Sequence, residues 1–316
     1  MLDAHEKEAW GMDSELLEDF LELAKELSFS RAAEMRSMTQ PAFSRRIRAL
    51  EETVGTALVH RTSRTVRLTP AGKTFQPHAA TILRLIADAQ AEALAAAGRA
   101  ELTLNLAATH ALSHRFVPGW LMHVAGPAGI GALSMVSDTQ QQLAGQMLRG
   151  AADFLVCYGS SQMDISGLPS RHYRSHAIGH DLLVPLCARA ADGSPLWSLD
   201  DTSHDIPWIT YGSASGLHHI LEAAWKMQPK PRLEPRMSSV LATTNMEMAR
   251  QGLGVSWLPL SLAGDLLANE SLVRAGGHRH DVPVNIVLYR PRARLSPHAE
   301  SFWQRAITAS MQELHA

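Results

Sequence analysis

Four polar side chains suited to reading nucleic-acid bases fall within nine residues of each other: Gln40, Ser44, Arg45 and Arg48. Read as a helix, this stretch repeats Phe43, Ile47 and Leu50 at i, i+4 and i+7, which makes one apolar stripe. The four polar residues lie mostly on the other side. Gln and Arg can form paired hydrogen bonds with base edges in the major groove. The stretch therefore predicts a helix that reads DNA.

The neighbouring residues supply the elements that must position this helix. Thr39 can cap its start, and Pro41 is tolerated in a first turn, where its missing N–H would be unpaired anyway. A first amphipathic helix is predicted from Leu16, Phe20, Ala24 and Leu27. Ser30 can cap a short second helix that carries Ala32, Ala33 and Met35. Residues 58–68 predict two short strands around a basic tip, so the order is that of a winged helix-turn-helix.

The predicted DNA contacts fall into two groups. Gln40, Pro41, Ser44 and Arg45 are expected at base edges, with Thr39 beside them, and Arg46, Arg48, Arg61 and Arg64 mainly on phosphates. Residues 12–30 carry one Lys and six Asp or Glu, whereas residues 31–73 carry nine Lys or Arg and three Glu. The positive charge is therefore local, as expected of a DNA-binding face. The alternative is a packed three-helix domain with a merely solvated basic face.

Three motifs in this region carry a family resemblance. They are Phe29-Ser30-Arg31-Ala32-Ala33, Ser44-Arg45-Arg46-Ile47-Arg48-Ala49-Leu50-Glu51 and Leu68-Thr69-Pro70-Ala71-Gly72. Together they resemble the N-terminal domain of LysR-type transcriptional regulators, in order from Met12 to Lys73. The resemblance implies a regulator that binds double-stranded operator DNA as a homodimer or homotetramer, responds to a small-molecule effector, and can contact RNA polymerase. Activation and repression remain open, as does a translation start at Met1 or Met12.

Length and composition limit the number of domains and the class of protein. The 316 residues suffice for two or three domains, and 46% apolar residues support real cores. No segment reaches the roughly 18 to 20 consecutive apolar residues of a membrane span. Residues 1–11 form a charged tail without the apolar core of a signal peptide, so we expect a cytoplasmic protein. Cys157 and Cys187 lie in apolar runs and are interpreted as buried reduced thiols; a redox pair, the alternative, lacks C-x-x-C spacing.

Residues 12–70 are assigned to the winged domain, and a long helix is predicted over residues 71–98. Its apolar residues step by four and three at Phe75, Ala79, Ile82, Ile86, Ala89, Ala93 and Ala96. Such a heptad seam predicts pairing with the same helix of a second chain. Packing on the chain's own C-terminal domain is the alternative. The family resemblance favours pairing, because this position is occupied there by a dimerising linker helix.

Residues 101–316 alternate strand-like and helix-like segments, which predicts an α/β architecture with largely parallel sheets. The resemblance implies two lobes like those of a periplasmic binding protein. Lobe I would comprise residues 101–178 and 282–316, and lobe II residues 179–281. The chain would cross near residues 176–179 and return near residues 281–285.

Ligands of such sheets bind beyond the carboxyl ends of strands, where helix starts favour anions. Three strand ends lead into hydroxyl-rich helix starts. The expected effector-binding residues are Thr109, His110, Ser113, Tyr211, Ser213, Ser215, Ser238, Ser239 and Thr243. The resemblance implies that such positions line an effector site. The partial positive charge of helix starts suits that site to a small carboxylate. Plain helix capping by Ser and Thr is the alternative.

The sequence lacks the usual catalytic and metal-binding patterns. The sequence has no Gly-x-Ser-x-Gly motif and no G-x-x-x-x-G-K-[ST] phosphate loop, so we predict no enzyme, no cofactor and no catalytic residues. Sixteen histidines include His110 and His114 at i, i+4, but none has the spacing of a structural zinc site. Surface and loop histidines are the better interpretation.

A finer resemblance concerns the signal. Residues 41–51, 107–113 and 254–259 look most like the hypochlorite-responsive LysR-type regulators, a subgroup associated with methionine oxidation. The chain has 13 Met, with Met237, Met246 and Met248 close in sequence. Oxidation makes the thioether polar and could bias a lobe interface. Core filling is the ordinary role of such residues.

Overall fold

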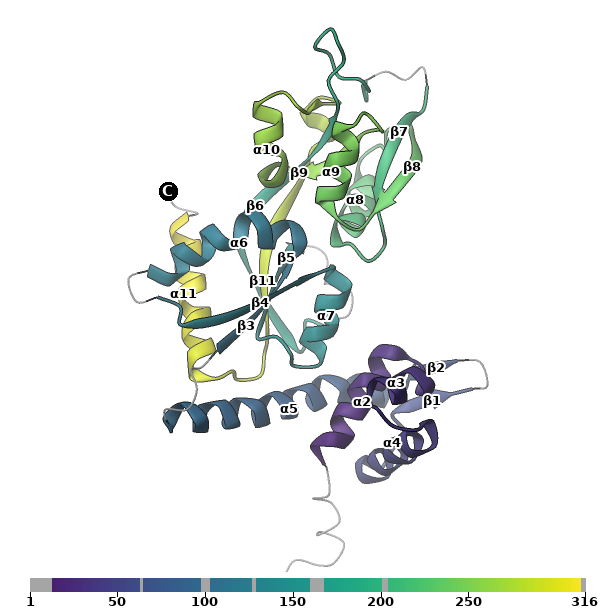
Figure 1. Cartoon of the computed structure of the whole chain (residues 1–316), viewed down its shortest axis with the longest axis vertical. Coiled ribbons are helices and arrows are strands. Elements are labelled where there is room, and N and C mark those ends of the chain that lie inside the picture. Colours follow the sequence, from purple (N-terminus) through teal and green to yellow (C-terminus); the bar gives the residue numbers. More distant parts are fainter. Residues whose placement is uncertain are drawn as a thin grey trace, which may run out of the picture. The chain divides into compact units, whose positions relative to one another are not determined.

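The computed structural model describes residues 13–62, 65–97, 103–126, 129–159, 168–200 and 204–313 (Figure 1). The predicted tail and Arg64 lie outside these ranges. The chain divides into two compact units, one made of residues 1–102 with 145–151, the other of residues 103–144 with 152–316.

The first unit has the predicted winged helix-turn-helix order. Its elements are α2 (Ser14–Glu26), α3 (Phe29–Met35), α4 (Gln40–Val54), β1 (Val59–Arg61), β2 (Val66–Leu68) and α5 (Pro70–Ala96). Thr39 caps α4 as predicted, because its hydroxyl accepts a hydrogen bond from the backbone N–H of Ala42 at 3.4 Å. Phe43, Ile47 and Leu50 are buried, which confirms the apolar stripe.

Two local predictions for this unit are wrong. The cap of α3 is Ser28, whose hydroxyl accepts from the backbone N–H of Arg31, and not Ser30. The buried face of α2 consists of Leu17, Phe20, Leu21 and Leu23. Leu27 lies outside the helix, in a left-handed cap with φ 47°, and is 47% exposed. The predicted face is therefore confirmed at Phe20 and, partly buried, at Leu16, and it is wrong at Leu27.

Helix α5 is tied to the winged domain at its first turn. Thr69 caps it by accepting from the backbone N–H of Gly72. A Cβ at Gly72 would lie 2.0 Å from the carbonyl oxygen of Leu58, so only glycine permits this approach. Phe75 and Ala79 pack into the core of the winged domain, so these two predicted seam residues are not available to a second chain. Beyond them, the exposed apolar side chains are Ile82, Leu85, Ile86 and Leu94.

The second unit is α/β, as predicted. Its strands are β3 (Thr103–Thr109), β4 (Ala132–Asp138), β5 (Phe154–Gly159), β6 (Tyr173–Cys187), β7 (Ile206–Tyr211), β8 (Leu233–Ser239), β9 (Ser256–Pro259), β10 (Val273–Arg274) and β11 (Val282–Pro291). Its helices are α6 (His110–Ala125), α7 (Gln140–Leu148), α8 (Gly216–Met227), α9 (Ala242–Arg250), α10 (Leu260–Ala268), the short η2 (His278–His280) and α11 (Pro297–Glu313).

The expectation of largely parallel sheets holds only in part. A seven-stranded sheet has the order β10-β6-β11-β5-β3-β4, with β9 also pairing β6. Strands β3, β4 and β5 are parallel, as are β7 and β8 of a separate pair. Strands β6 and β11 run antiparallel to their neighbours, because each carries the chain from one lobe to the other.

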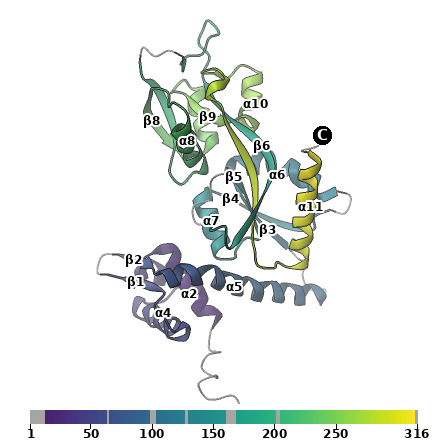
Figure 2. The same cartoon turned by 180° about the vertical axis from the view of Figure 1, so that it is seen from behind.

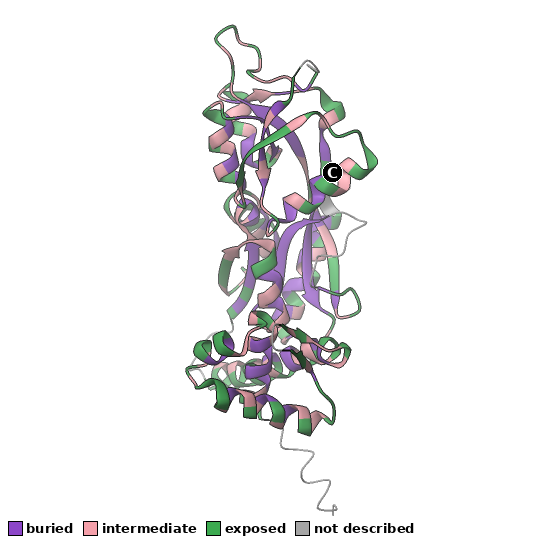
Figure 3. Cartoon of the chain, turned by 90° about the vertical axis from the view of Figure 1, so that its right-hand side faces the viewer, coloured by how far each residue is buried: buried purple, intermediate pink, exposed green. Residues whose placement is uncertain are grey.

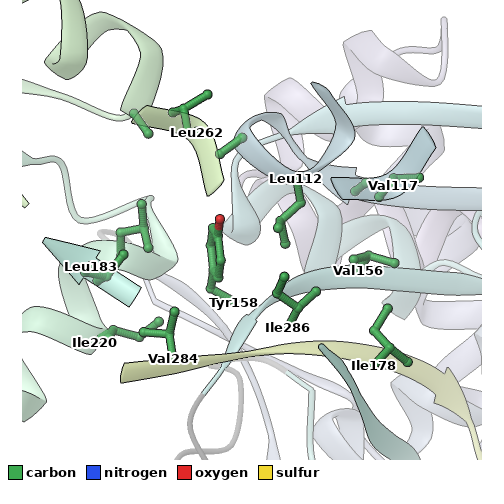
Figure 4. Close-up of a cluster of buried hydrophobic side chains, with 14 of the residues drawn as sticks. Leu112, Val117, Val156, Tyr158, Ile178, Leu183, Ile220, Leu262, Val284 and Ile286 are labelled. Atoms are coloured by element: carbon green, nitrogen blue, oxygen red, sulfur yellow. The ribbon is translucent and has the colours of Figure 1, made fainter. Parts of the chain in front are cut away.

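Figures 1 and 2 show β6 and β11 as long paired strands that extend through both lobes. Their register shifts between Ile286 and Val287, opposite Ala177 and Gly179. One apolar cluster continues through both lobes and includes Leu112, Tyr158, Ile220 and Leu262 (Figure 4). Figure 3 shows the central strands largely in purple, the colour of buried residues. The lobes therefore share a core and are joined by continuous β-structure.

Candidate functional sites

The predicted base-reading residues lie at the exposed start of α4. Thr39, Gln40, Pro41 and Arg45 are exposed, and Ser44 is half-buried. An open hollow of about 660 Å³ lies between this helix start, α3 and the strands β1 and β2. Gln40 and Ser44 line it from one side and Arg61 from the other. The guanidinium of Arg61 lies over the ring of Phe29, 5.8 Å from its centroid. The start of α4 and the β1–β2 hairpin thus border one polar concavity.

Arg46 does not share that surface. Its guanidinium turns toward α2, where it pairs with Asp19 and, at 2.9 Å, with Glu15. Asp19 is fully buried and also accepts a hydrogen bond from Arg36 at 2.8 Å. The assignment of Arg46 to phosphates is therefore corrected, because its guanidinium forms ion pairs with Asp19 and Glu15 of the same domain. Arg48, by contrast, is exposed.

In the second unit, several helix starts meet at one pocket. Among the described residues, its lining comes from the starts of α6 (Thr109, His110, Ala111), α7 (Asp138, Thr139, Gln140), α8 (Ser215, Gly216, Leu217) and α9 (Val240, Ala242), together with Tyr158. Helix starts present free N–H groups and a partial positive charge. The pocket's volume is about 30 Å³, room for roughly two water molecules.

Two hydroxyls at this pocket lack hydrogen-bond partners within the described ranges. Oγ1 of Thr109 is buried and unpaired, although Thr109 immediately precedes α6. Ser215 precedes α8, is 7% exposed and makes no side-chain capping bond. Hydroxyls in cap positions normally accept from their own helix. These two are therefore free to donate to, or accept from, a bound molecule.

A second pocket of about 240 Å³ adjoins the first. It is lined by Gln140, Gln141, Ser213, Ala214, Gly216 and His219, so the two pockets share Gln140 and Gly216. The side chain of Gln140 lies directly on the first residue of α8, because a Cβ at Gly216 would be 1.7 Å from Gln140 Oε1. The backbone N–H of Gln141 also donates to the carbonyl of Ala214 at 3.5 Å. These contacts join lobe I to lobe II.

Of the nine predicted effector residues, the structure brings Thr109, His110 and Ser215 into the smaller pocket and Ser213 into the larger one. The other five do not line either. Tyr211 is a core residue whose hydroxyl donates to the carbonyl of Trp257 at 2.9 Å. The hydroxyl of Ser113 donates to the carbonyl of His110 within α6, and that of Ser239 accepts from the backbone N–H of Leu241. Ser238 and Thr243 are exposed.

The sequence reasoning missed the contribution of α7. Asp138, Thr139 and Gln140 line the smaller pocket, but residues 132–138 had not been recognised as a strand. A signal was present, because Asp-Thr after a run containing Leu133, Met135 and Val136 is a typical strand end and helix start. Tyr158 lies at the end of β5, and its hydroxyl donates to Asp181 at 2.8 Å.

Other candidate sites offer little support for further chemistry. No group of three His, Cys, Asp or Glu side chains in the described ranges is arranged to hold a metal ion. Cys157 and Cys187 are free and buried, and burial raises the pKa of both thiols, which disfavours the reactive thiolate. The described helices include none with the length and apolarity of a membrane span.

Family models match both the winged helix-turn-helix unit and the α/β unit. The model of the bacterial regulatory helix-turn-helix protein, lysR family, matches residues 14–73, and that of the LysR substrate binding domain matches residues 97–310. The HTH-type transcriptional regulator YjiE of Escherichia coli K12 is 26% identical over 293 residues, covering 93% of each chain.

Solved structures give the same result. Vibrio fischeri DarR, in complex with DNA, is 31% identical, covers 95% of this chain and 99% of its own, and has a TM-score of 0.55. Full-length HypT of Salmonella typhimurium, described as a hypochlorite-specific LysR-type transcriptional regulator, is 24% identical with the same coverages and a TM-score of 0.57. At that identity, HypT supports the fold alone.

Proposed function

The chain belongs to the LysR family of DNA-binding transcription regulators, and from this premise we propose that it reads operator DNA through α4 and the β1–β2 wing and is switched by a small anion held between its lobes. Regulators of this family bind operators and small-molecule effectors and form oligomers. The family is one of regulators and not of enzymes. We place the protein's action in the cytoplasm, where operator DNA is found.

The proposed DNA face uses the exposed residues at the start of α4. Gln40, Ser44 and Arg45 would reach base edges, with Thr39 and Pro41 beside them. Arg48 and Arg61 would contact phosphates, and so would Arg64, which lies outside the described residues. The open hollow shared by Gln40, Ser44 and Arg61 supports a common binding surface. Charge on this surface would position the protein, whereas base contacts would supply sequence preference.

One observation carries the proposed effector site: the unpaired hydroxyls of Thr109 and Ser215 face the same pocket from different lobes. A small anion there would accept hydrogen bonds from both and from the N–H groups of the surrounding helix starts. Because Thr109 precedes α6 in lobe I and Ser215 precedes α8 in lobe II, a bound anion would stabilise one arrangement of the lobes relative to others. That differential stabilisation is what a regulatory ligand requires.

We further propose that α5 pairs with its counterpart in a second chain, and that pairs assemble into tetramers. The support is the exposed apolar set Ile82, Leu85 and Ile86, which share one side of α5 at 3.6 residues per turn, whereas Leu94 lies on another side. Isolated exposed apolar residues are common, but several along one long helix favour helix pairing.

The small volume of the pocket favours a second candidate, a switch operated by hypochlorite through methionine oxidation. Met237, on β8, is 39% exposed, whereas Met246 and Met248 pack against the cluster that includes Leu186, Ile209 and Leu258. Oxidation of a packed methionine would introduce a polar sulfoxide into that cluster. An oxidant switch needs no ligand-sized cavity.

One titration separates the two candidates. Operator binding by the purified protein is followed while small carboxylates, and separately hypochlorite, are added. For the anion switch, we expect a carboxylate response that is lost in Thr109→Val and Ser215→Ala. Ser113→Ala is the matched control, because its hydroxyl bonds within α6 and does not line the pocket. A response to hypochlorite alone, reversed by methionine sulfoxide reductase, would replace the anion site with the oxidant switch.

A further inference from the structure

The smaller pocket contains a carboxylate, that of Asp138, which would disfavour the binding of a simple anion. Asp138 is the one acidic side chain in its described lining, and that lining has no Lys or Arg. Oδ1 of Asp138 accepts from the backbone N–H of Thr139 at 2.6 Å. Within the described ranges, its second carboxylate oxygen has no hydrogen-bond partner. An anion placed beside this carboxylate is repelled unless the same ligand also carries a positive group.

We propose that the effector is a free α-amino acid, with its ammonium group on Asp138 and its carboxylate at the hydroxyls of Thr109 and Ser215. This deepens the proposed anion switch and rests on it. In an α-amino acid, the ammonium nitrogen and the carboxylate carbon are both bonded to Cα, so the two opposite charges lie close together. The pocket offers the matching pair of charges, because it places the carboxylate of Asp138 among several helix starts with partial positive charge. Beyond the helix starts themselves, Ser215 supports a ligand here, because it is 93% buried, faces the pocket and has no capping bond.

Gln140 sets the size of the side chain that such an amino acid can carry. The smaller pocket alone holds roughly two waters, less than a complete amino acid needs. Gln140 lies between it and the adjoining pocket of about 240 Å³, and Oε1 of Gln140 is buried without a partner in the described ranges. No hydrogen bond of that oxygen opposes rotation of the side chain. Rotation joins the two pockets and places the amino-acid side chain beside Ser213 and His219.

The alternative role of Asp138 is structural, because its Oδ1 accepts from the backbone N–H of Thr139, which itself caps α7 by accepting from the N–H of Gln142. The amide oxygen of Asn can accept the same hydrogen bond. Asp138→Asn therefore keeps this hydrogen bond and removes only the charge. A structural role predicts no change in ligand preference, whereas an ammonium site predicts that the preference is lost.

The experiment is calorimetric titration of the full-length protein with the protein amino acids and with their counterparts that lack the amino group, such as alanine with propionate and aspartate with succinate. We expect at least one amino acid to bind more tightly than its counterpart by about tenfold or more, as for one charge-assisted hydrogen bond. Asp138→Asn should make the two affinities nearly equal without changing the melting temperature. Gln140→Ala should admit amino acids with larger side chains.

Equal affinity of the wild-type protein for both members of every pair would overturn the ammonium site and leave the anion switch intact. An amino-acid preference that persists in Asp138→Asn would also overturn it. If no probe of either class binds the wild-type protein, both the amino-acid proposal and the carboxylate switch fail. If Asp138→Asn does not fold, the comparison of paired ligands on the wild-type protein still decides the question.

Discussion

The guanidinium of Arg46 on α4 is held by the fully buried carboxylate of Asp19 on α2. Arg36, which caps the end of α3, donates to the same carboxylate at 2.8 Å. One acidic residue thus links all three helices of the winged domain. Other acidic residues of α2 also stabilise the domain, because Glu18 pairs with Arg36 and Glu15 pairs with Arg46. The position of α4 is therefore held by ion pairs within the winged domain.

Replacing Arg46 should destabilise the winged domain. Arg46→Ala leaves Asp19 with one arginine partner, and disrupting a buried pair costs on the order of 3 kcal/mol. We expect faster hydrogen exchange in peptides from α2 and α4. Arg45→Ala is the matched control, since Arg45 is the exposed neighbour on the same helix. Unchanged exchange in Arg46→Ala, together with a smaller salt dependence of DNA binding, would mean that Arg46 faces phosphate.

Arg45 and Arg48 should separate sequence reading from charge. Arg45→Ala is expected to weaken operator binding by about 1–3 kcal/mol and to relax specificity, whereas Arg48→Ala should weaken all DNA alike and lower the salt slope by about 1. Gel-shift titrations over operator and random DNA at several salt concentrations measure both effects. Both residues are exposed, so thermal unfolding should be unchanged. If Arg45→Ala bound the operator normally, the proposed orientation of α4 would be wrong.

The sequence was most informative where periodicity and capping act locally. Thr39, Phe43, Ile47 and Leu50 specify α4 through neighbours within a few turns. Contacts between distant segments were not predictable. Nothing near Arg46 in the chain indicates that it pairs with Asp19, 27 residues away, or that Gln140 lies on Gly216. Tyr211 was misassigned for the same reason, because its partner, Trp257, is far along the chain.

Charged residues in the exposed part of α5 should prevent chain pairing. In Ile82→Glu with Ile86→Glu, the carboxylates would be buried in the proposed seam without partners, which is strongly unfavourable. Sedimentation velocity should show a smaller assembly than for the wild-type protein. Ala87→Glu with Ala91→Glu is the control, because at 3.6 residues per turn these positions lie on the far side of the helix from Ile82. An unchanged assembly in the first variant would exclude α5 as the interface.

A pH-dependent contribution to stability should come from Glu300 on α11. Both of its carboxylate oxygens accept from the buried guanidinium of Arg290 at 2.6 Å, and Leu295 donates its backbone N–H at 2.9 Å. The hydrogen bonds from Arg290 are the main reason that the pKa of Glu300 falls from 4.5 to about 2, against the opposing effect of burial. A lowered pKa in the folded state means that the ionised carboxylate stabilises the fold.

This stabilisation should be complete above pH 4.5 and disappear as the pH falls toward 2. Glu300→Gln should therefore be less stable at neutral pH by about 2 kcal/mol, a figure reduced for the partial exposure of the carboxylate. Urea unfolding of both proteins at a series of pH values measures the difference. Tryptophan fluorescence is a suitable signal, because six of the seven Trp lie in residues 103–316. The difference should shrink below pH 4.5, because the carboxylate of the unfolded wild-type chain takes up a proton there while that of the folded chain stays ionised until about pH 2. A difference that stayed constant down to pH 3 would assign the effect of the substitution to packing instead of charge.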